Sequence, residues 1–370
     1  MPESTLEEIG RIIEAAVAAG RVPGVVAAVG RGPSSLGSWV AGYADTTAPN
    51  SPGTPNSPGT GAGRPMRADT VFDLASLTKV VATTTMTLAL AAGGQLRLDD
   101  PVSLYLPVTW EVTIRHLLSH ASGLPPTVKF FEWCANKDEL LRDLYATPPQ
   151  APPGTRVAYS DLGFMALGEI VTKVSGESLD VLFGRLVASP LGMTRAGYIP
   201  LSAAVPLTGS PASPPAGGFA ATELRADGTP WTGIVHDENA RVMGGVAGHA
   251  GLFATISDLT RFAAWWVSPD DGPVPAALRR EAETCQTLGL DGRRGLGWTS
   301  IGDRYDILGE TWPPTAVSHT GFTGTSLALD SASGVWVALL TNRVHLGRDA
   351  SAPAIKSLRR DIHTAAARCL

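Results

Sequence analysis

Segments typical of β-strands lie near the two ends of this 370-residue chain, and this placement constrains its fold more than any other feature. Apolar runs at residues 24–31 and 37–44 are joined by a turn rich in Gly, Pro and Ser, and two more runs lie at 325–330 and 334–342. Between about residues 76 and 290 the pattern is mostly helical, interrupted by loops rich in proline and glycine. Strands from both ends are therefore expected to meet in one sheet, with the helical stretch inserted between them.

We predict an α/β plus all-α fold with two interlocked domains. Residues 1–80 and 290–370 are expected to form a discontinuous α/β domain, whose antiparallel sheet is flanked by helices, and residues 81–289 an inserted helical domain. The flanking helices are predicted at residues 4–19, where apolar side chains repeat at helical spacing, and near residues 352–368. The cleft between the two domains is the natural place for a ligand.

The segment 45–66 differs from the rest of the chain in its low complexity. It contains the pentapeptide "NSPGT" twice, at residues 50–54 and 56–60. Such Pro/Gly/Ser-rich sequence does not form a packed element, so we predict a flexible surface loop without a functional role.

Charge, hydropathy and cysteine content exclude several classes of protein. The net charge of −5 provides no basic stripe, so no nucleic acid partner is expected. Mean hydropathy is close to zero, and no uninterrupted apolar run reaches the length of a membrane span, so no membrane partner is expected. The N-terminus is acidic where an export signal would be basic, which predicts a cytoplasmic protein. Cys134, Cys285 and Cys369 are far apart and form no CxxC pair, so neither a zinc site nor a disulfide framework is expected.

Four histidines could suggest a metal site, but their spacing does not support one. His116 and His120 have the i, i+4 spacing of a metal-binding pair, yet no third ligand follows at a suitable distance and no HExxH frame is present. His236 and His249 lie in a segment rich in polar residues and glycine, where we expect them to hydrogen-bond loop carbonyls. We therefore predict neither a metal nor a cofactor.

The stretch "VFDLASLTKVVATTTMTLAL" places Ser76 and Lys79 one helical turn apart at the start of an apolar helix. A serine hydroxyl needs a neighbouring base before it can attack a carbonyl. The apolar run that follows is expected to bury Lys79 and thereby to lower its pKa, which would make it such a base. Because the chain contains 26 serines and five lysines, the pair could also arise by chance.

A second candidate is Tyr159, in "PGTRVAYSDLGFMALGEIV", which follows a turn and precedes an apolar helical stretch. A phenol oxygen in that place can act as a base when nearby cations lower its pKa. The alternative is structural: Tyr159 packs at an interface and Asp161 caps the helix.

A third candidate is the turn in "SHTGFTGTSLALD", which leads into a predicted strand. Gly321 and Gly324 would allow a substrate to approach the backbone closely, and strand-edge N–H groups could hold it. His319 and Thr320 could bind a substrate carboxylate or carbonyl. Alternatively, the segment is an ordinary tight turn.

The order and spacing of these three elements resemble those of the penicillin-recognising serine enzymes. The resemblance is greatest to the branch that contains class C β-lactamases, D-Ala-D-Ala carboxypeptidases and related esterases. The segments that carry it cover most of residues 20–345: "FDLASLTK", "LRLDDPVSLYLP", "TIRHLLSHASGLP", "PGTRVAYSDLGFMALGEIV", "PLGM", "GGVAGHAGLF" and "HTGFTGTSLALD". The resemblance implies a β-lactamase/transpeptidase-like fold, in agreement with the predicted domain pattern.

The resemblance also implies roles for individual residues. Ser76 would be the acylated nucleophile and Lys79 its general base. Tyr159 matches the tyrosine of a Tyr-x-Asn element, and would relay protons to the leaving group.

His319, Thr320 and Gly321 match the Lys/His-Thr-Gly strand that holds the substrate in this family. The N–H of Phe322 would complete the oxyanion hole with that of Ser76.

Two positions depart from the family pattern. Asp161 stands where the pattern often has Asn, which changes the expected contact with a substrate amide. His319 replaces lysine, which weakens the expectation of carboxylate recognition. The resemblance therefore does not by itself predict efficient hydrolysis of β-lactams.

We predict a serine acyl-enzyme hydrolase that acts on a small ester or amide. One alternative is an ATP-independent transacylase of secondary metabolism, which passes the Ser76-bound acyl group to an amine or alcohol. Another is a non-catalytic binding or sensor homologue. The expected partners are a small-molecule acyl donor and, for the transacylase, a nucleophilic acceptor.

Overall fold

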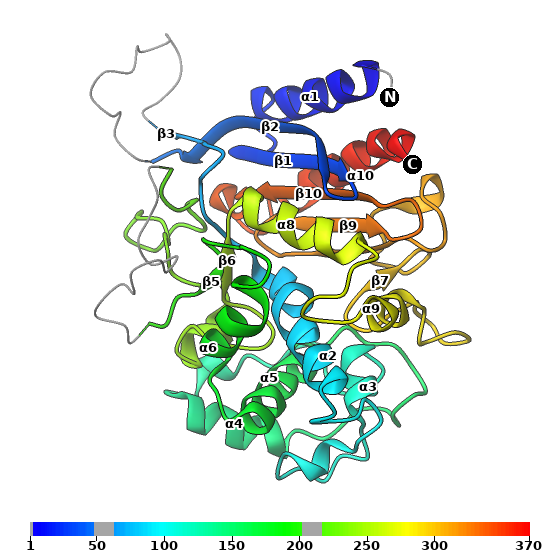
Figure 1. Ribbon diagram of the computed structural model, residues 1–370. Coiled ribbons are helices and arrows are strands. Elements are labelled where there is room, and N and C mark those ends of the chain that lie inside the picture. The colour runs from blue at the N-terminus through cyan, green and yellow to red at the C-terminus, as the bar shows by residue number, and fades with distance from the viewer. Residues whose placement is uncertain (1–2, 48–62, 202–216) are drawn as a thin grey trace.

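The computed structural model describes residues 3–47, 63–201 and 217–370 (Figure 1). Most of the predicted loop 45–66 thus lies outside the described residues. Its C-terminal end differs from the prediction, because β3 (Arg64–Pro65) pairs with β2 (Ser34–Asp45) and belongs to the sheet.

The central element is a seven-stranded sheet. Besides β2 and β3 it contains β1 (Gly24–Arg31), β7 (Thr299–Ser300), β8 (Val317–Thr320), β9 (Ser326–Asp330) and β10 (Val335–Thr341). The strand order is β3-β2-β1-β10-β9-β8-β7, and every pairing is antiparallel. Strands from the two ends of the chain meet at its centre, where β1 pairs with β10. These two strands are buried on both faces, which explains their uninterrupted apolar sequences.

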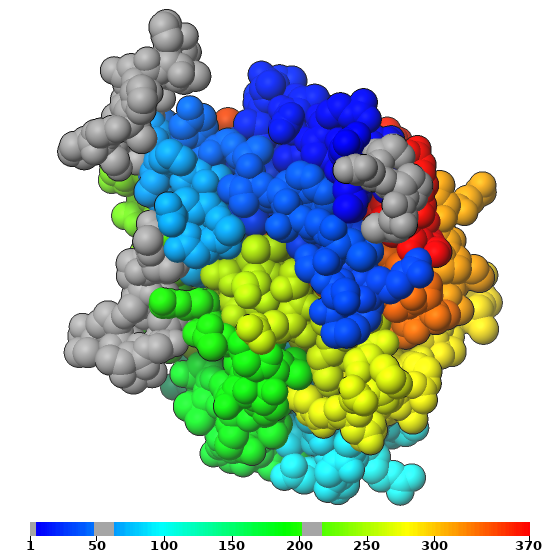
Figure 2. All heavy atoms as spheres, turned by 45° about the horizontal axis from the view of Figure 1, so that its top comes forward, coloured from blue at the N-terminus to red at the C-terminus, as the bar shows by residue number. Residues whose placement is uncertain are grey.

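Helices cover both faces of this sheet. Val25, Ala27 and Val29 pack beneath α1 (Glu3–Ala18) and α10 (Ala352–Ala366), which lie side by side. Figure 2 shows the same neighbourhood on the surface, where the N-terminal segment in blue adjoins the C-terminal segment in red. The alternating side chains of β1 face α8 (Ile256–Val267) on the opposite side. The expected antiparallel sheet with flanking helices is therefore confirmed.

The placement of α8 departs from the predicted domain boundaries. This helix lies within residues 81–289, which were expected to form the helical domain, yet it packs on β1, β9 and β10. The reason is its wide apolar face, which includes Leu259, Phe262 and Trp266 and is buried against the sheet.

The helical part of the molecule lies below the sheet in Figure 1. Its helices are α2 (Thr85–Ala92), α3 (Ile114–Leu118), α4 (Lys137–Ala146), α5 (Asp161–Ser175), α6 (Leu179–Phe183), α7 (Glu238–Val242) and α9 (Ala276–Glu283). A small second sheet has the order β4-β6-β5 and consists of β4 (Phe72–Asp73), β6 (Leu252–Ala254) and β5 (Gly197–Tyr198). Short 3-10 or π-helical turns lie at Ala75–Leu77, Lys79–Thr84, Val102–Leu104, Phe130–Glu132, Gly184–Ala188, Gly309–Thr311, Arg343–Leu346 and Ala367–Cys369.

The segment 75–92 corrects one expectation from the sequence. By length and composition it is apolar enough to cross a membrane, although no such segment was expected. In the structure 78% of this segment is buried inside the fold, where it consists of a 3-10 turn that contains Ser76, a π-helical turn and α2. A core helix meets the same length and composition criteria as a membrane span, so burial by protein accounts for its apolar sequence.

Candidate active site

A cavity of about 300 Å³ lies where the end of β8 meets the segment that carries Ser76 and the start of α5. It contains every predicted site residue except Lys79, which is fully buried beneath it. The lining residues are Ser76, Tyr159, Asp161, Asp237, Arg294, Thr299, Tyr305, His319, Thr320, Gly321, Phe322, Arg343 and Arg359.

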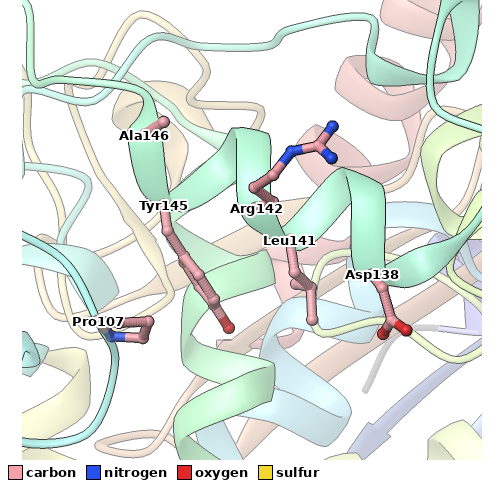
Figure 3. A pocket seen from close by; sticks show the side chains of 6 residues that line it. All are labelled: Pro107, Asp138, Leu141, Arg142, Tyr145 and Ala146. Atoms are coloured by element: carbon pink, nitrogen blue, oxygen red, sulfur yellow. The ribbon is translucent and has the colours of Figure 1, made fainter.

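A larger hollow of about 480 Å³ lies over α4 and is shown in Figure 3. It is lined by Pro107, Asp138, Leu141, Arg142, Tyr145 and Ala146. None of these residues is a serine, cysteine or histidine, so this hollow offers no pair of nucleophile and base. The cavity at Ser76 has a serine hydroxyl in contact with a lysine, and it is therefore the candidate active site.

Ser76 lies on a tight 3-10 turn that precedes the π-helical turn containing Lys79. The preceding residue, Ala75, has a φ of +47°, a left-handed conformation that is unfavourable for alanine. The Asp73 carboxylate fixes this turn by accepting a hydrogen bond from the Ala75 N–H at 2.8 Å. As a result, the Lys79 ammonium donates to Ser76 Oγ at 3.0 Å and to the carbonyl oxygen of His249 at 2.9 Å.

The expectation that burial lowers the pKa of Lys79 is wrong. Burial does act in that direction, but the Asp161 carboxylate lies 2.7 Å from Lys79 Nζ and, together with Tyr159, outweighs it. The pKa of Lys79 therefore lies above its ordinary value. Lys79 is therefore a cation in the free protein. Its partner is Asp161, which stands where the family pattern often has asparagine.

Tyr159 contacts both Lys79 and the ring of His120. Lys79 Nζ lies 5.0 Å from the centre of the Tyr159 ring, and the centres of the Tyr159 and His120 rings are 4.6 Å apart. Burial raises the pKa of the Tyr159 hydroxyl; Lys79 opposes this rise, and Asp161 reinforces it. The phenol therefore keeps its proton in the free protein, although it was expected to serve as a base.

The structural alternative for Asp161 is also wrong, because the neighbouring Ser160 caps α5. Ser160 Oγ accepts the hydrogen bond from the Gly163 N–H at 3.3 Å. Asp161 is thus free to extend from the first turn of α5 into the cavity and toward Lys79.

His120 positions the segment that carries Tyr159. Its carbonyl accepts from the Ala158 N–H at 2.9 Å, and its Nδ1 accepts from the Ser160 N–H at 3.0 Å. Burial and the nearby cations hold the pKa of His120 well below its usual value, so its ring is neutral and Nδ1 can accept. His116, its supposed metal partner, instead caps α3 together with Thr113.

The end of β8 and the following turn form the opposite wall of the cavity. Burial, together with Lys79 and Arg294, holds the pKa of His319 well below its usual value, so His319 is neutral. Where the family pattern often has a lysine, this chain therefore presents an uncharged ring to the cavity.

The turn after Thr320 is fixed directly to the segment before Ser76. Thr323 Oγ1 donates to the Asp73 carbonyl at 2.8 Å, and Thr325 Oγ1 donates to the Leu74 carbonyl at 3.0 Å. A Cβ on Gly321 would lie 2.4 Å from the Leu74 carbonyl oxygen, so only glycine fits there. The Phe322 N–H has no hydrogen-bond acceptor among the described residues, which leaves it available to a substrate.

Two histidines have roles that the sequence did not predict. His249 Nε2 pairs with the Asp237 carboxylate at 2.8 Å, and His236 Nε2 pairs with Glu223 at 3.1 Å, whereas loop carbonyls were expected as partners. Burial alone would raise the pKa of Asp237, but His249 outweighs it and the pKa falls below the ordinary range. The Asp237–His249 pair fixes the His249 backbone carbonyl, which accepts a hydrogen bond from Lys79 Nζ.

The sequence also gave no indication of three arginines in the cavity wall. Arg294 is buried and pairs with the buried Asp303 at 3.0 Å, while Arg343 and Arg359 come from segments that follow β10. The only related feature of the sequence is its surplus of arginine over lysine, which does not show which arginines lie near the site. Arg343 and Arg359 reach the cavity because β10 lies next to β9 and the chain then turns back over the sheet.

Comparison with known proteins agrees with this geometry. Residues 9–359 match the family model described as Beta-lactamase. A putative D-alanyl-D-alanine carboxypeptidase of Escherichia coli (strain K12) is 30% identical over 322 residues, which cover 76% of this chain and 71% of the relative. The N-acetylmuramyl-L-alanine amidase of Bacillus subtilis (strain 168) is 30% identical over 315 residues, which cover 76% of this chain and 69% of the relative.

The fold is shared with the solved structure of EstCE1, a hydrolase with promiscuous acyltransferase activity. The TM-score is 0.72 at 21% identity, and the superposition covers 97% of this chain and 99% of that one. The β-lactamase/transpeptidase-like fold implied by the sequence is thus confirmed. Together with the match over nearly the whole length, these similarities show that the chain belongs to the beta-lactamase family and is an enzyme of the serine hydrolase type.

Proposed function

We propose that this enzyme hydrolyses a small ester or amide through an acyl-enzyme on Ser76. The observation that carries the proposal is the 3.0 Å contact between Lys79 Nζ and Ser76 Oγ at the floor of a cavity. Nucleophilic catalysis requires a nucleophile within hydrogen-bond distance of a base, and a third residue that orients this base. Asp161 is that third residue, at 2.7 Å from Lys79 Nζ.

Acylation begins with a change in the Lys79–Asp161 pair, because an ammonium group cannot accept the serine proton. When a substrate fills the cavity and displaces water, charge separation becomes less favourable there. The Asp161 side chain, 23% exposed in the free enzyme, becomes buried at the same time. A proton then passes from Lys79 Nζ to the Asp161 carboxylate, which leaves a neutral amine and a neutral acid.

The neutral Lys79 amine accepts the proton of Ser76 Oγ as the serine oxygen bonds to the substrate carbonyl carbon. The carbonyl electrons move to the oxygen, which the N–H groups of Phe322 and Ser76 stabilise. Tyr159 donates its proton to the leaving group as the bond to that group breaks, and takes a proton from Lys79 in exchange. Water then attacks the acyl-enzyme, and the proton transfers run in reverse.

The proposal is tested by replacing the nucleophile. Ser76→Ala should lose measurable hydrolysis of p-nitrophenyl esters and labelling by a fluorophosphonate probe. The exposed Ser103 provides a matched control, and Ser103→Ala should keep both activities. Retention of hydrolysis by Ser76→Ala would show that another group is the nucleophile.

A second candidate function is acyl transfer to an amine or alcohol. It is favoured by the likeness in fold to EstCE1, described as a hydrolase with promiscuous acyltransferase activity. The acyl donor and the acceptor would then both be small molecules. Added acceptor should accelerate turnover and give a new ester or amide; free acid alone at every acceptor concentration would reject transfer. The non-catalytic alternative is disfavoured by the direct contact of Ser76 with Lys79.

A further inference from the structure

Arg359 is a buried cation without a carboxylate partner among the described residues. Its residue exposure is 9%, and the ion pairs between described residues do not include it. Burial, reinforced by the neighbouring Arg343, lowers the pKa of its guanidinium to about 9, so Arg359 still carries its charge at neutral pH. Burial of a charge without a carboxylate partner costs several kcal/mol, so the hydrogen bonds that this residue makes indicate its role.

The hydrogen bonds of Arg359 converge on the turn that borders the active site. Its Nη2 donates to the Gly321 carbonyl at 2.8 Å and to the Thr325 carbonyl at 2.7 Å. The Thr325 carbonyl also accepts from the Gly321 N–H at 2.7 Å, which closes the turn. One buried guanidinium therefore holds both ends of the segment that contains Phe322.

The Gly321 carbonyl and the Phe322 N–H belong to one peptide group. In a trans peptide these two groups point in opposite directions, and every described peptide bond is trans. A positive charge on the carbonyl side draws electrons toward the oxygen and makes the N–H on the other side a stronger donor. That N–H is the one without an acceptor among the described residues.

We propose that Arg359 is a positioning residue that acts through the Gly321–Phe322 peptide and strengthens the Phe322 N–H as a donor to the oxyanion. The neighbouring Arg343 supports the next peptide group, because its Nε donates to the Phe322 carbonyl at 2.9 Å. Donors that are fixed before the reaction and aimed at developing charge make large contributions to catalysis. This inference rests on the proposed acyl-enzyme mechanism, since it concerns the oxyanion of that mechanism.

The most direct test measures the carbonyl bond of the acyl-enzyme. A p-nitrophenyl ester with an isotope-labelled carbonyl gives an infrared band whose frequency falls as hydrogen bonding to the carbonyl becomes stronger. We expect this band to lie at higher frequency in Arg359→Met than in the native enzyme, and at an intermediate frequency in Arg359→Lys. The acylation rate should fall by roughly tenfold or more in Arg359→Met, with KM for an uncharged ester unchanged.

The neighbouring Arg360 is exposed and provides the matched control on the same helix, so Arg360→Met should leave the band and the rate unchanged. If Arg359→Met fails to fold, Arg359→Lys still decides, because its ammonium keeps the charge on a side chain that is one atom shorter and does not reach the position of Nη2. A band at the native frequency in a folded Arg359 variant would overturn the inference. So would a rise in KM confined to esters that carry a carboxylate, since Arg359 would then bind substrate directly.

The same experiment separates this inference from the proposed function. If the native enzyme forms no acyl-enzyme, the nucleophile mechanism and the role of Arg359 both fail. If the native acyl-enzyme forms but its carbonyl band does not respond to Arg359, only the role of Arg359 fails.

Discussion

Replacement of Gly321 by alanine should disable the enzyme without unfolding it. The added Cβ would lie 2.0 Å from Thr325 Oγ1 and 2.4 Å from the Leu74 carbonyl oxygen, whereas real Cβ atoms essentially never approach other heavy atoms closer than 3.0 Å. The threonine hydroxyl can rotate away, but the Leu74 carbonyl belongs to the backbone. The turn must therefore move by at least roughly 0.6 Å, and the Phe322 N–H moves with it.

The expected loss follows from the role of that N–H. Removal of one oxyanion donor lowers kcat by roughly 100-fold to 1,000-fold, and a displacement approaching 1 Å has an effect of about 100-fold. We therefore expect kcat/KM of Gly321→Ala to fall by about 100-fold, equivalent to about 2.7 kcal/mol of transition-state stabilisation.

The assay is steady-state hydrolysis of a p-nitrophenyl ester, with circular dichroism and thermal unfolding to verify the fold. Gly184 provides the matched control, because a Cβ there would meet no heavy atom within 4 Å and its φ is not positive. Gly184→Ala should retain native activity. If Gly321→Ala is folded and its kcat/KM remains within a few-fold of the native value, the turn does not supply an oxyanion donor.

Three further changes test other parts of the site and of the fold. Asp161→Asn should lower the pKa of Lys79, because burial then acts without the carboxylate that opposes it. Nuclear magnetic resonance of isotope-labelled Lys79 should show that its ammonium loses a proton at lower pH than in the native enzyme. The same titration midpoint in both proteins would contradict the assigned ion pair. Tyr159→Phe should lower kcat by roughly 100-fold to 1,000-fold while thermal stability changes little, and an unchanged kcat would exclude a role in proton transfer. Burial raises the pKa of Glu283 to about 7 from its usual 4.5, so the folded protein keeps a proton that the unfolded chain has lost. The free energy of unfolding should therefore fall as pH rises from about 4.5 to 7, by on the order of 3 kcal/mol from this group, and Glu283→Gln should remove that part of the pH dependence in urea titrations.

Features encoded in short segments were predictable from the sequence. Alternating and apolar runs located β1, β2, β9 and β10, and helical spacing located α1 and α10. The resemblance to a known family then connected Ser76, Tyr159 and His319, which the fold does bring to one cavity. These predictions succeeded because each depends on residues that are close together in the sequence, or on a pattern of spacing.

The charge state of Lys79 could not be predicted in this way. Its local sequence indicates burial alone, which lowers a lysine pKa, whereas the partner that raises it, Asp161, is supplied by another helix. Asp237 and Arg359 were missed for the same reason, since nothing near them in the sequence shows that they face the cavity. The apolar face of α8 was visible, but which layer it would cover depends on tertiary packing.

The central claim is that Ser76 carries the acyl group during turnover. Rapid acid quenching of the enzyme with an activated ester, followed by proteolysis and mass spectrometry, tests it most directly. We predict that the peptide containing Ser76 gains the mass of one acyl group, and that this gain is absent in Ser76→Ala but present in Ser103→Ala. An acyl group on a different residue, or hydrolysis without any acylated peptide, would contradict the account.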